Sequence, residues 1–310
     1  MPGIHHVTCI SGRADRNLDF YTRILGLRFV KRTVNFDDPT TYHLYYGDEV
    51  GQPGTVLTFF PWEHAAAGRA GVGQAQETAF RVPAGSIGYW THRLVEKGVA
   101  HERPEKRFGE TVLPFSDSDG LRAALIGVPE AENEPAWSTH DIPLEHAIRG
   151  FHGVTLLLDD AARTAAILTD VLAFTEAGRE GYVRRFSVGR GAGGTVDLRE
   201  AHGFLPGTMG HGAVHHVAFR AADDAEQAKL ARKVVENHGV QTTDQKDRHY
   251  FRSIYFREPG GVLFEIATDQ PGFAVDEPVS RLGGALKLPR FLEERRKEIE
   301  AVLPPLDLAA

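Results

Sequence analysis

Residues 3–11, GIHHVTCIS, and residues 212–221, GAVHHVAFRA, are two versions of one strand, and the segments that follow them recur in the same order. The first is followed by NLDFYTRILGL (17–27), which predicts a helix with Phe20, Tyr21, Ile24 and Leu25 on one face. Two strand-like runs come next, TYHLYYG and GTVLTFF. The second is followed by the helical AEQAKLARKVVENHG and by the strands RSIYFRE and GVLFEIATD. A repeated unit of strand, helix and strands therefore organises the chain.

Two looser copies lie between these, at residues 76–128 and 151–200. Each is a βαβββ unit, which has too little apolar surface to fold alone and must pair with another copy. We therefore predict an α+β fold in which four βαβββ modules pair into two open β-barrel halves. Modules 1 and 2 should occupy residues 1–128, a Pro- and Glu-rich linker 129–150, and modules 3 and 4 residues 151–275.

Residues 276–310 form a C-terminal tail outside the repeat. Its sequence predicts an amphipathic helix over 289–302, with one stripe made by Phe291, Leu292, Ile299 and Val302. Such a helix would be a lid, a contact in a homo-oligomer, or a cover for one sheet.

Composition limits the classes of function. The chain has 310 residues and a net charge of −7 with acids and bases interleaved, which argues against nucleic acid and favours a small-molecule partner. No stretch approaches the roughly 18 apolar residues of a membrane span, and no secretory signal is visible, so a cytoplasmic protein is expected. With 15 histidines and one cysteine, any metal site should use imidazole and carboxylate, which suits Fe, Mn, Ni or Zn.

The repeat allows equivalent positions to be compared within the chain. Aligning Val7 with Val217 places His6 opposite His216, and aligning the Pro-Gly turns places Glu265 opposite Phe59. The looser copies have Glu77 and Gly153 at the histidine position, and Leu125 and Arg199 at the Glu265 position. Only the outer copies then carry the histidine, and only the last carries the acid. Two imidazoles and one carboxylate are the donors of the facial triad that leaves open positions on Fe(II).

Each candidate ligand histidine follows another histidine, His5 or His215. Strand alternation places neighbours on opposite faces, so one of each pair should point into the barrel. We choose the second, because Thr8 then shares a face with His6 while Val7 and Cys9 share the other. The first histidines would lie behind the ligands or face outward.

At this point the chain resembles a known family, the ring-cleaving dioxygenases of the vicinal-oxygen-chelate superfamily, and within it the hydroquinone dioxygenase branch. The phrases that carry the resemblance span nearly the whole chain and include IHHVT, FYTRILGLRFVKRTVNFDDP, YHLYYGDEVGQPGTVLTFFPW, VHHVAFR and RSIYFREPGGVLFEIATD. The resemblance implies that Fe(II) is held at His6, His216 and Glu265, with modules 1 and 4 sharing one barrel and modules 2 and 3 the other. It places the surrounding functional positions at His5, Thr8, His215, Arg248 and Tyr255.

The expected reaction is cleavage of a hydroquinone-type ring by O2, with a small aromatic substrate. Tyr255 and one of His5 or His215 would transfer protons, and Arg248 would hold the anionic intermediate. Three alternatives stay open: an extradiol catechol dioxygenase, a glyoxalase-like lyase using Mn(II), Zn(II) or Ni(II), and a metal-free small-molecule binding protein. A lyase of that kind usually takes a carboxylate from each paired module, and Phe59 at the partner position argues against it.

Overall fold

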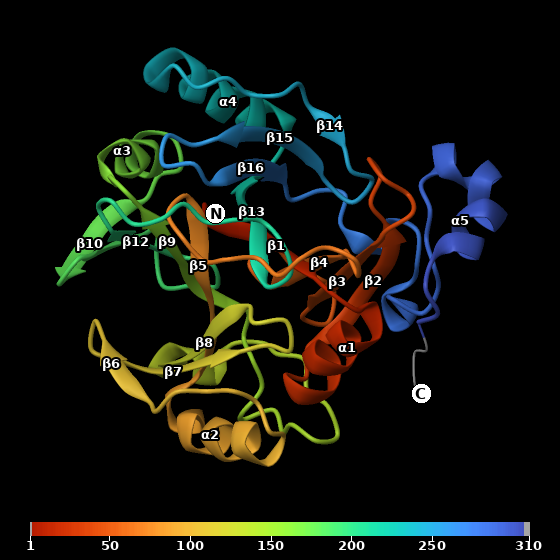
Figure 1. The fold of residues 1–310 in the computed structure, drawn as a ribbon, viewed down its shortest axis with the longest axis horizontal. Coiled ribbons are helices and arrows are strands. Elements are labelled where there is room, and N and C mark those ends of the chain that lie inside the picture. Colours follow the sequence, from red (N-terminus) through yellow and green to blue (C-terminus); the bar gives the residue numbers. More distant parts are fainter. Residues whose placement is uncertain (1, 307–310) are drawn as a thin grey trace.

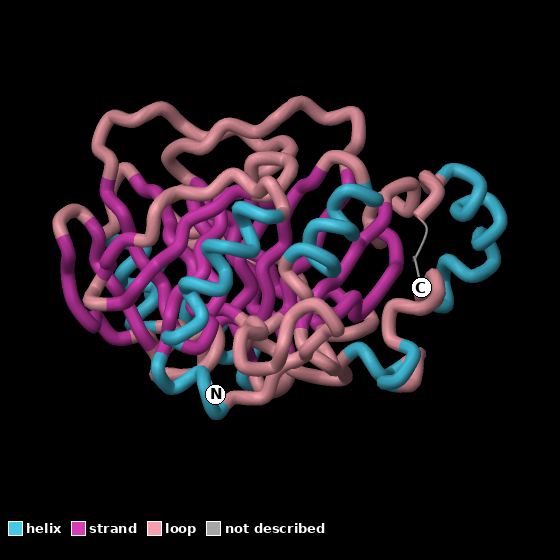
Figure 2. The backbone as a smooth tube through the Cα atoms, turned by 90° about the horizontal axis from the view of Figure 1, so that it is seen from below, coloured by secondary structure: helices cyan, strands magenta, loops and turns pink. Residues whose placement is uncertain are grey.

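The computed structural model describes residues 2–306. Its strands form two eight-stranded sheets, β14-β15-β16-β13-β1-β4-β3-β2 and β10-β11-β12-β9-β5-β8-β7-β6. In Figure 1 the first sheet lies above and to the right and the second lies below and to the left, with helices on their outer sides. Figure 2 shows the strands of both sheets in one central layer between loops and helices.

Each copy of the repeat supplies four strands and a helix. The first contains β1 (Ile4–Ser11), α1 (Ala14–Asp19), β2 (Arg28–Val34), β3 (Tyr42–Gly47) and β4 (Val56–Pro61). The second contains β5 (Gln74–Pro83), α2 (Ile87–Glu96), β6 (Glu105–Arg107), β7 (Glu110–Ser116) and β8 (Arg122–Val128). The third contains β9 (Phe151–Leu158), α3 (Ala162–Asp170), β10 (Thr175–Glu180), β11 (Val183–Ser187) and β12 (Thr195–Glu200). The fourth contains β13 (Ala213–Ala221), α4 (Asp224–His238), β14 (Lys246–Asp247), β15 (Arg252–Arg257) and β16 (Leu263–Thr268).

The copies pair as the resemblance implies. β1 of the first copy runs antiparallel to β13 of the fourth, and β5 of the second runs antiparallel to β9 of the third. The prediction of two half-barrels with modules 1 and 4 in one and modules 2 and 3 in the other is confirmed. Every residue of β1 is buried, because β1 lies at the centre of the first sheet between β13 and β4.

Two predicted helices differ from the structure. The helix predicted from Asn17 starts at Ala14, and over Phe20–Ile24 it becomes a π-helical turn in which the Leu25 amide donates to the Phe20 carbonyl. The predicted tail helix begins as a 3-10 helix, Arg290–Arg295, and only α5 (Arg296–Val302) is α-helical.

The tail buries half of its predicted stripe. Leu292 and Ile299 are buried, whereas Phe291 and Val302 are 65% and 59% exposed, because the tighter 3-10 winding rotates Phe291 away from the contact. The Lys287 amide donates to the Arg32 carbonyl and the Tyr42 hydroxyl donates to the Pro304 carbonyl. The tail therefore covers the end of the first sheet at β2, an edge that would otherwise present unpaired backbone groups.

A β-bulge lies at the first residue of each histidine pair, His5-His6 and His215-His216. Between Ile4 and His6 the ladder with β13 skips His5, and between Thr8 and Cys9 it skips His215. The second sheet has the same two bulges, at Gln76 and His152. A bulge interrupts side-chain alternation, so the simple face argument does not hold for His5 and His215.

The strand registers correct one alignment made from sequence. Thr8 lies opposite Thr58 in β4, whereas Ala218, which matches Thr8, lies opposite Glu265 in β16. The structural counterparts of Glu265 are therefore Thr58, Ala124 and Asp197 rather than Phe59, Leu125 and Arg199. Thr58 lies five positions after Pro53 whereas Glu265 lies six positions after Pro259, so counting from the Pro-Gly turns displaced the register of the first copy by one residue.

Candidate metal centre

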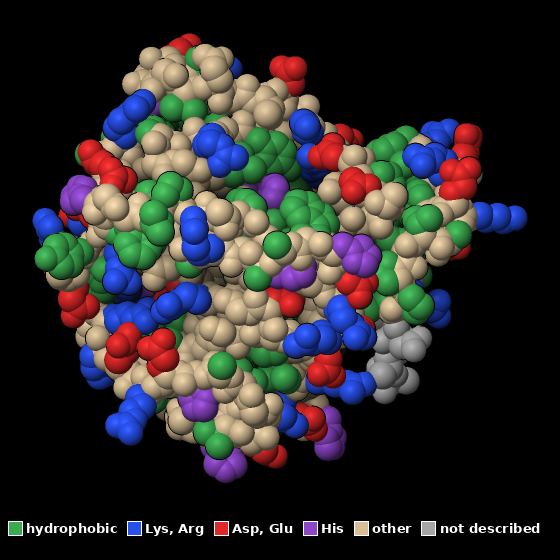
Figure 3. Space-filling model, viewed as in Figure 1, with side chains coloured by type: hydrophobic (Ala, Val, Ile, Leu, Met, Phe, Trp, Pro, Cys, Tyr) green, Lys and Arg blue, Asp and Glu red, His purple; other side chains and the backbone are tan. Residues whose placement is uncertain are grey.

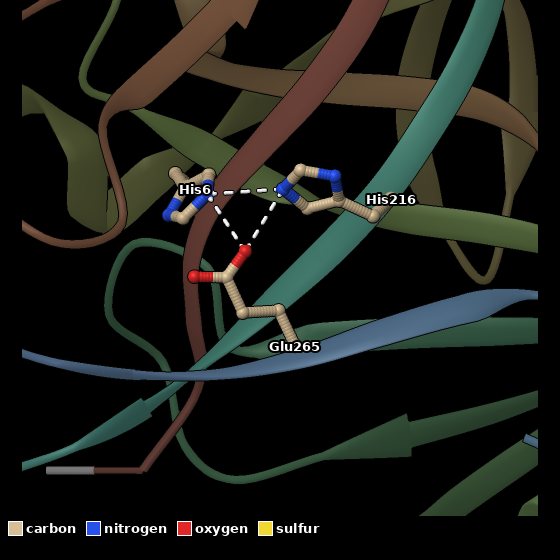
Figure 4. Close-up of side chains that lie close together, drawn as sticks. All are labelled: His6, His216 and Glu265. Carbon is tan, nitrogen blue, oxygen red and sulfur yellow. Dashed lines mark hydrogen bonds and ion pairs between the residues drawn. The ribbon is translucent and has the colours of Figure 1, made fainter. Parts of the chain in front are cut away.

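His6, His216 and Glu265 converge on the inner face of the first half-barrel (Figure 4). Their nearest ring-nitrogen and carboxylate atoms all lie within 4.8 Å of one another. Glu265 Oε2 is 2.9 Å from His216 Nε2 and 3.5 Å from His6 Nε2, and the two Nε2 atoms are 3.3 Å apart. The three side chains come from β1, β13 and β16, which are adjacent strands. Residues more than two hundred positions apart in sequence therefore meet because copies one and four share a sheet.

The carboxylate of Glu265 fits a cation better than it fits its protein surroundings. Oε1 accepts a hydrogen bond from Ser253 Oγ at 2.5 Å, whereas Oε2 is buried and, within residues 2–306, no group is oriented to donate to it. Burial alone raises the pKa of Glu265, but His6 and His216 outweigh that effect and hold the pKa well below its usual value. An ionised oxygen facing two imidazole nitrogens is the arrangement that a divalent metal satisfies.

The first histidine of each doublet contacts the second through the ring. His5 Nδ1 lies 2.9 Å from His6 Nδ1, and His215 Nδ1 lies 2.8 Å from His216 Nδ1. This contact between sequence neighbours is possible because His5 and His215 are the bulge residues. The first histidine of each pair therefore lies against the second rather than facing outward, and His6 and His216 are the two that converge with Glu265.

A cavity of about 410 Å³ reaches this cluster at His216. His215, His216, Arg248 and Tyr255 lie on its lining, as does Phe251, whose ring is 4.8 Å from that of His6. The face in Figure 3 shows acidic and basic side chains interspersed. Three of the five predicted surrounding residues thus line the cavity, whereas His5 and Thr8 are buried outside it.

Arg248 and Tyr255 form a connected pair at the cavity wall. Arg248 Nε donates to the Tyr255 hydroxyl at 3.3 Å, and Arg248 Nη2 lies 2.8 Å from Asp37 Oδ2. Burial alone lowers the pKa of Arg248, but Tyr255 and Asp37 raise it above its usual value, so the guanidinium stays charged. Burial, followed by the charge of Glu265, raises the pKa of Tyr255, so its hydroxyl keeps its proton.

Sequence reasoning missed the opposite wall, which is formed by His43, Tyr45, Phe60 and Trp62. His43 and Tyr45 are two residues apart in β3 and so lie on the same face of the strand. The period of two in YHLYYG was a signal that could have found them, but the aromatic residues of that run were equally consistent with core. Thr8 reaches this wall through Thr58, which donates to it at 2.9 Å.

Within residues 2–306, no helix has the length and apolarity needed to span a membrane.

The fold is that of a known superfamily. The model of the Glyoxalase/Bleomycin resistance protein/Dioxygenase superfamily matches residues 3–125 and 150–266, and the chain belongs to this superfamily. Glyoxalase I from Zea mays has the same fold, with a TM-score of 0.65 over 87% of this chain and 93% of that one at 15% identity.

More similar relatives define the class of enzyme. Two Bacillus subtilis proteins provisionally named ring-cleaving dioxygenases MhqO and MhqE are each 43% identical, over 99% and 98% of this chain and 97% and 99% of their own. The Chlorohydroquinone/hydroquinone 1,2-dioxygenase of Sphingobium indicum is 35% identical over 96% of this chain and 94% of its own. A crystal structure provisionally described as a Bacillus subtilis dioxygenase superposes with a TM-score of 0.94 at 43% identity, over 99% of this chain and 98% of that one. The chain is accordingly an oxidoreductase of the ring-cleaving dioxygenase type.

Proposed function

We propose that this chain is an Fe(II)-dependent dioxygenase that opens a hydroquinone-type ring with O2, with the metal held by His6, His216 and Glu265. The convergence of these three groups beneath an aromatic-walled cavity carries the proposal. Two neutral imidazoles and one carboxylate leave a dication with a net positive charge, which favours a phenolate ligand. The name of the Sphingobium relative, a hydroquinone 1,2-dioxygenase, supports the para-diol.

The metal, when bound, would lower the pKa of a coordinated phenol and bring the ring and O2 together. The surrounding side chains would prepare the ligands and the substrate. If His6 and His216 bind through Nε2, each carries its proton on Nδ1 and donates it to the Nδ1 atom of His5 or His215. The partner histidines would thereby fix the tautomer and orientation of the ligands.

Tyr255 and Arg248 would act on the substrate side. Since Arg248 donates to the Tyr255 oxygen, the Tyr255 proton is free to point into the cavity toward a substrate oxygen. The fixed charge of Arg248 would stabilise negative charge that develops on the ring oxygens. Asp37 would hold Arg248 at the wall through its second contact.

His215 and His5 would have different roles despite their equivalent positions. Burial, and then the neighbouring His216, lower the pKa of His215 to about 3, so its ring is neutral. Because its Nδ1 accepts from His216, its Nε2 carries the proton and would donate it within the cavity. His5 is buried away from the cavity, and its contact is with His6. Thr8 is likewise fully buried and would position Thr58 rather than touch substrate.

Metal analysis and oxygen uptake test the proposal together. Protein purified without oxygen should contain iron near one per chain, and oxygen uptake should be faster with hydroquinone and its chloro or methyl derivatives than with catechol. A faster rate with catechol would indicate an extradiol catechol dioxygenase. Zinc, nickel or manganese without oxygen uptake would indicate a lyase, and a metal-free protein that binds aromatic compounds would indicate a binding module.

A further inference from the structure

The internal twofold that relates copies one and four gives Tyr255 a counterpart across the cavity. Tyr255 in β15 lies opposite Glu265 in β16, and in the same way Tyr45 in β3 lies opposite Thr58 in β4. Since Thr58 is the structural counterpart of Glu265, Tyr45 is the counterpart of Tyr255. Both tyrosines line the cavity. The two half-sites therefore present one tyrosine hydroxyl each, but only one half-site carries the carboxylate.

The hydrogen bonds beside the two tyrosines also correspond. Ser253, two residues before Tyr255, donates to Glu265 Oε1 at 2.5 Å. His43, two residues before Tyr45, contacts Thr58 Oγ1 through Nε2 at 2.8 Å. The half-site of Tyr45, His43 and Thr58 thus has the strand geometry of the half-site of Tyr255, Ser253 and Glu265. It has neutral groups in place of the Glu265 carboxylate.

The direction of the hydrogen bonds in this chain follows from its two ends. Burial, followed by His6 and His216, lowers the pKa of His43 well below its usual value, so the ring is neutral and has one donor and one acceptor nitrogen. Thr58 donates its proton to Thr8, which leaves its oxygen to accept from His43 Nε2. His43 Nδ1 is then the acceptor, and the Tyr45 hydroxyl, 2.8 Å away, donates to it. The Tyr45 proton is committed, so Tyr45 can only accept from a molecule in the cavity.

We propose that Tyr45 binds the second hydroxyl of a para-diol as a hydrogen-bond acceptor, while the first hydroxyl is held at the metal half-site. This inference rests on the proposed function and assigns its substrate selectivity to a residue. A para-diol has donors at both ends of one ring, and the cavity lining combines the two tyrosines of the two half-sites with the aromatic side chains of Phe60 and Phe251. The class of preferred ligand is therefore a phenol with a hydrogen-bond donor at the para position.

The test measures equilibrium binding to the iron-loaded protein without oxygen, using hydroquinone, 4-aminophenol and phenol. The wild-type protein should prefer the two para-donor compounds over phenol. Tyr45→Phe removes the acceptor and keeps the ring, so the preference should fall by about tenfold, the effect of one lost hydrogen bond, while the affinity for phenol stays the same. Tyr46→Phe is the matched control, because its hydroxyl donates to Asn17 on the other face of β3.

Thr58→Val provides a second variant of nearly the same size. It removes the acceptor of His43 Nε2 but leaves the Tyr45 hydroxyl. The preference for hydroquinone and 4-aminophenol over phenol should therefore decrease, while the iron content stays unchanged. The inference is overturned if Tyr45→Phe weakens phenol and hydroquinone equally, or if Tyr46→Phe has the same effect. The binding preference could change as expected while the protein takes up no oxygen with hydroquinone after air is admitted. In that case the proposed reaction is wrong, and the assignment of Tyr45 as the acceptor for the para hydroxyl stands.

Discussion

At the scale of single residues, the candidate site depends on one carboxylate. Glu265 is the only anionic member of the cluster, and its Oε2 atom has no oriented donor in the described part of the chain. Glu265→Gln should abolish iron retention and turnover while the fold survives, because the amide keeps the shape but not the charge that a dication needs. Iron content and thermal unfolding by circular dichroism measure the two effects. Asp197→Asn, which changes the equivalent acid of the second sheet, should retain iron. Full activity in Glu265→Gln would show that the ligand lies elsewhere.

A second residue-scale prediction concerns Tyr255, whose hydroxyl accepts from Arg248 and lines the cavity. Tyr255→Phe should lower hydroquinone turnover by roughly 10- to 1000-fold, the range for a lost acid–base or oxyanion partner. Iron content should not change. Catechol turnover, measured by oxygen uptake on the same preparation, should fall less, because two oxygens on one ion fix the ring without protein help. Unchanged hydroquinone turnover in the variant would remove Tyr255 from the proposed mechanism.

At the scale of elements, the β-bulges decide what the doubled histidines do. A regular strand would place His5 and His6 on opposite faces, whereas the bulge brings their rings into contact. His5→Leu should weaken iron binding by about 10- to 100-fold, the usual effect of removing a partner of a ligand histidine. Gln76→Leu changes the matching bulge residue of the second sheet and is the control. Metal titration followed by protein fluorescence measures both affinities, and equal affinities in the two variants would contradict the role of His5.

At the scale of the whole molecule, the two sheets are joined by a contact that should respond to pH. The turn after β7 brings Asp117 to the helical segment of the first copy, where Tyr21 donates to Asp117 Oδ2 at 2.9 Å. Burial raises the pKa of Asp117 to about 6, despite hydrogen bonds from the Leu121 and Asp119 amides and from Tyr21, which lower it. An unfolded aspartate titrates near 3.9. Between these two values the folded state holds a proton that the unfolded state has released.

Protonation of Asp117 should therefore stabilise the folded state increasingly as the pH falls from about 6 towards 4. Relative to Asp117→Asn, the wild-type free energy of unfolding should increase by about 1 kcal/mol between pH 7 and pH 5. Denaturant unfolding of both proteins across that range measures the difference. Parallel pH profiles would mean that Asp117 titrates normally in the folded protein.

Much of this protein could be predicted from sequence because the repeat is a local signal that occurs four times. The order of strand, helix and strands identified the modules, and the matched positions of His6 and His216 identified two members of the cluster. Glu265 was also found, although its proposed counterpart, Phe59, was one residue from the true one, Thr58. Counting along a chain cannot detect such a shift, because register is set by hydrogen bonds between strands.

The tertiary structure alone decided which side chains share the cavity. Sequence alternation shows that His43 and Tyr45 face one side of a strand, but not that this side meets Tyr255 from a strand about two hundred residues away. Likewise, the contact of His5 with His6 needs a bulge, which exists only where two strands of unequal local length are paired. Local periodicity thus determines the modules and their buried faces, whereas the pairing of distant strands determines which groups on those faces become partners.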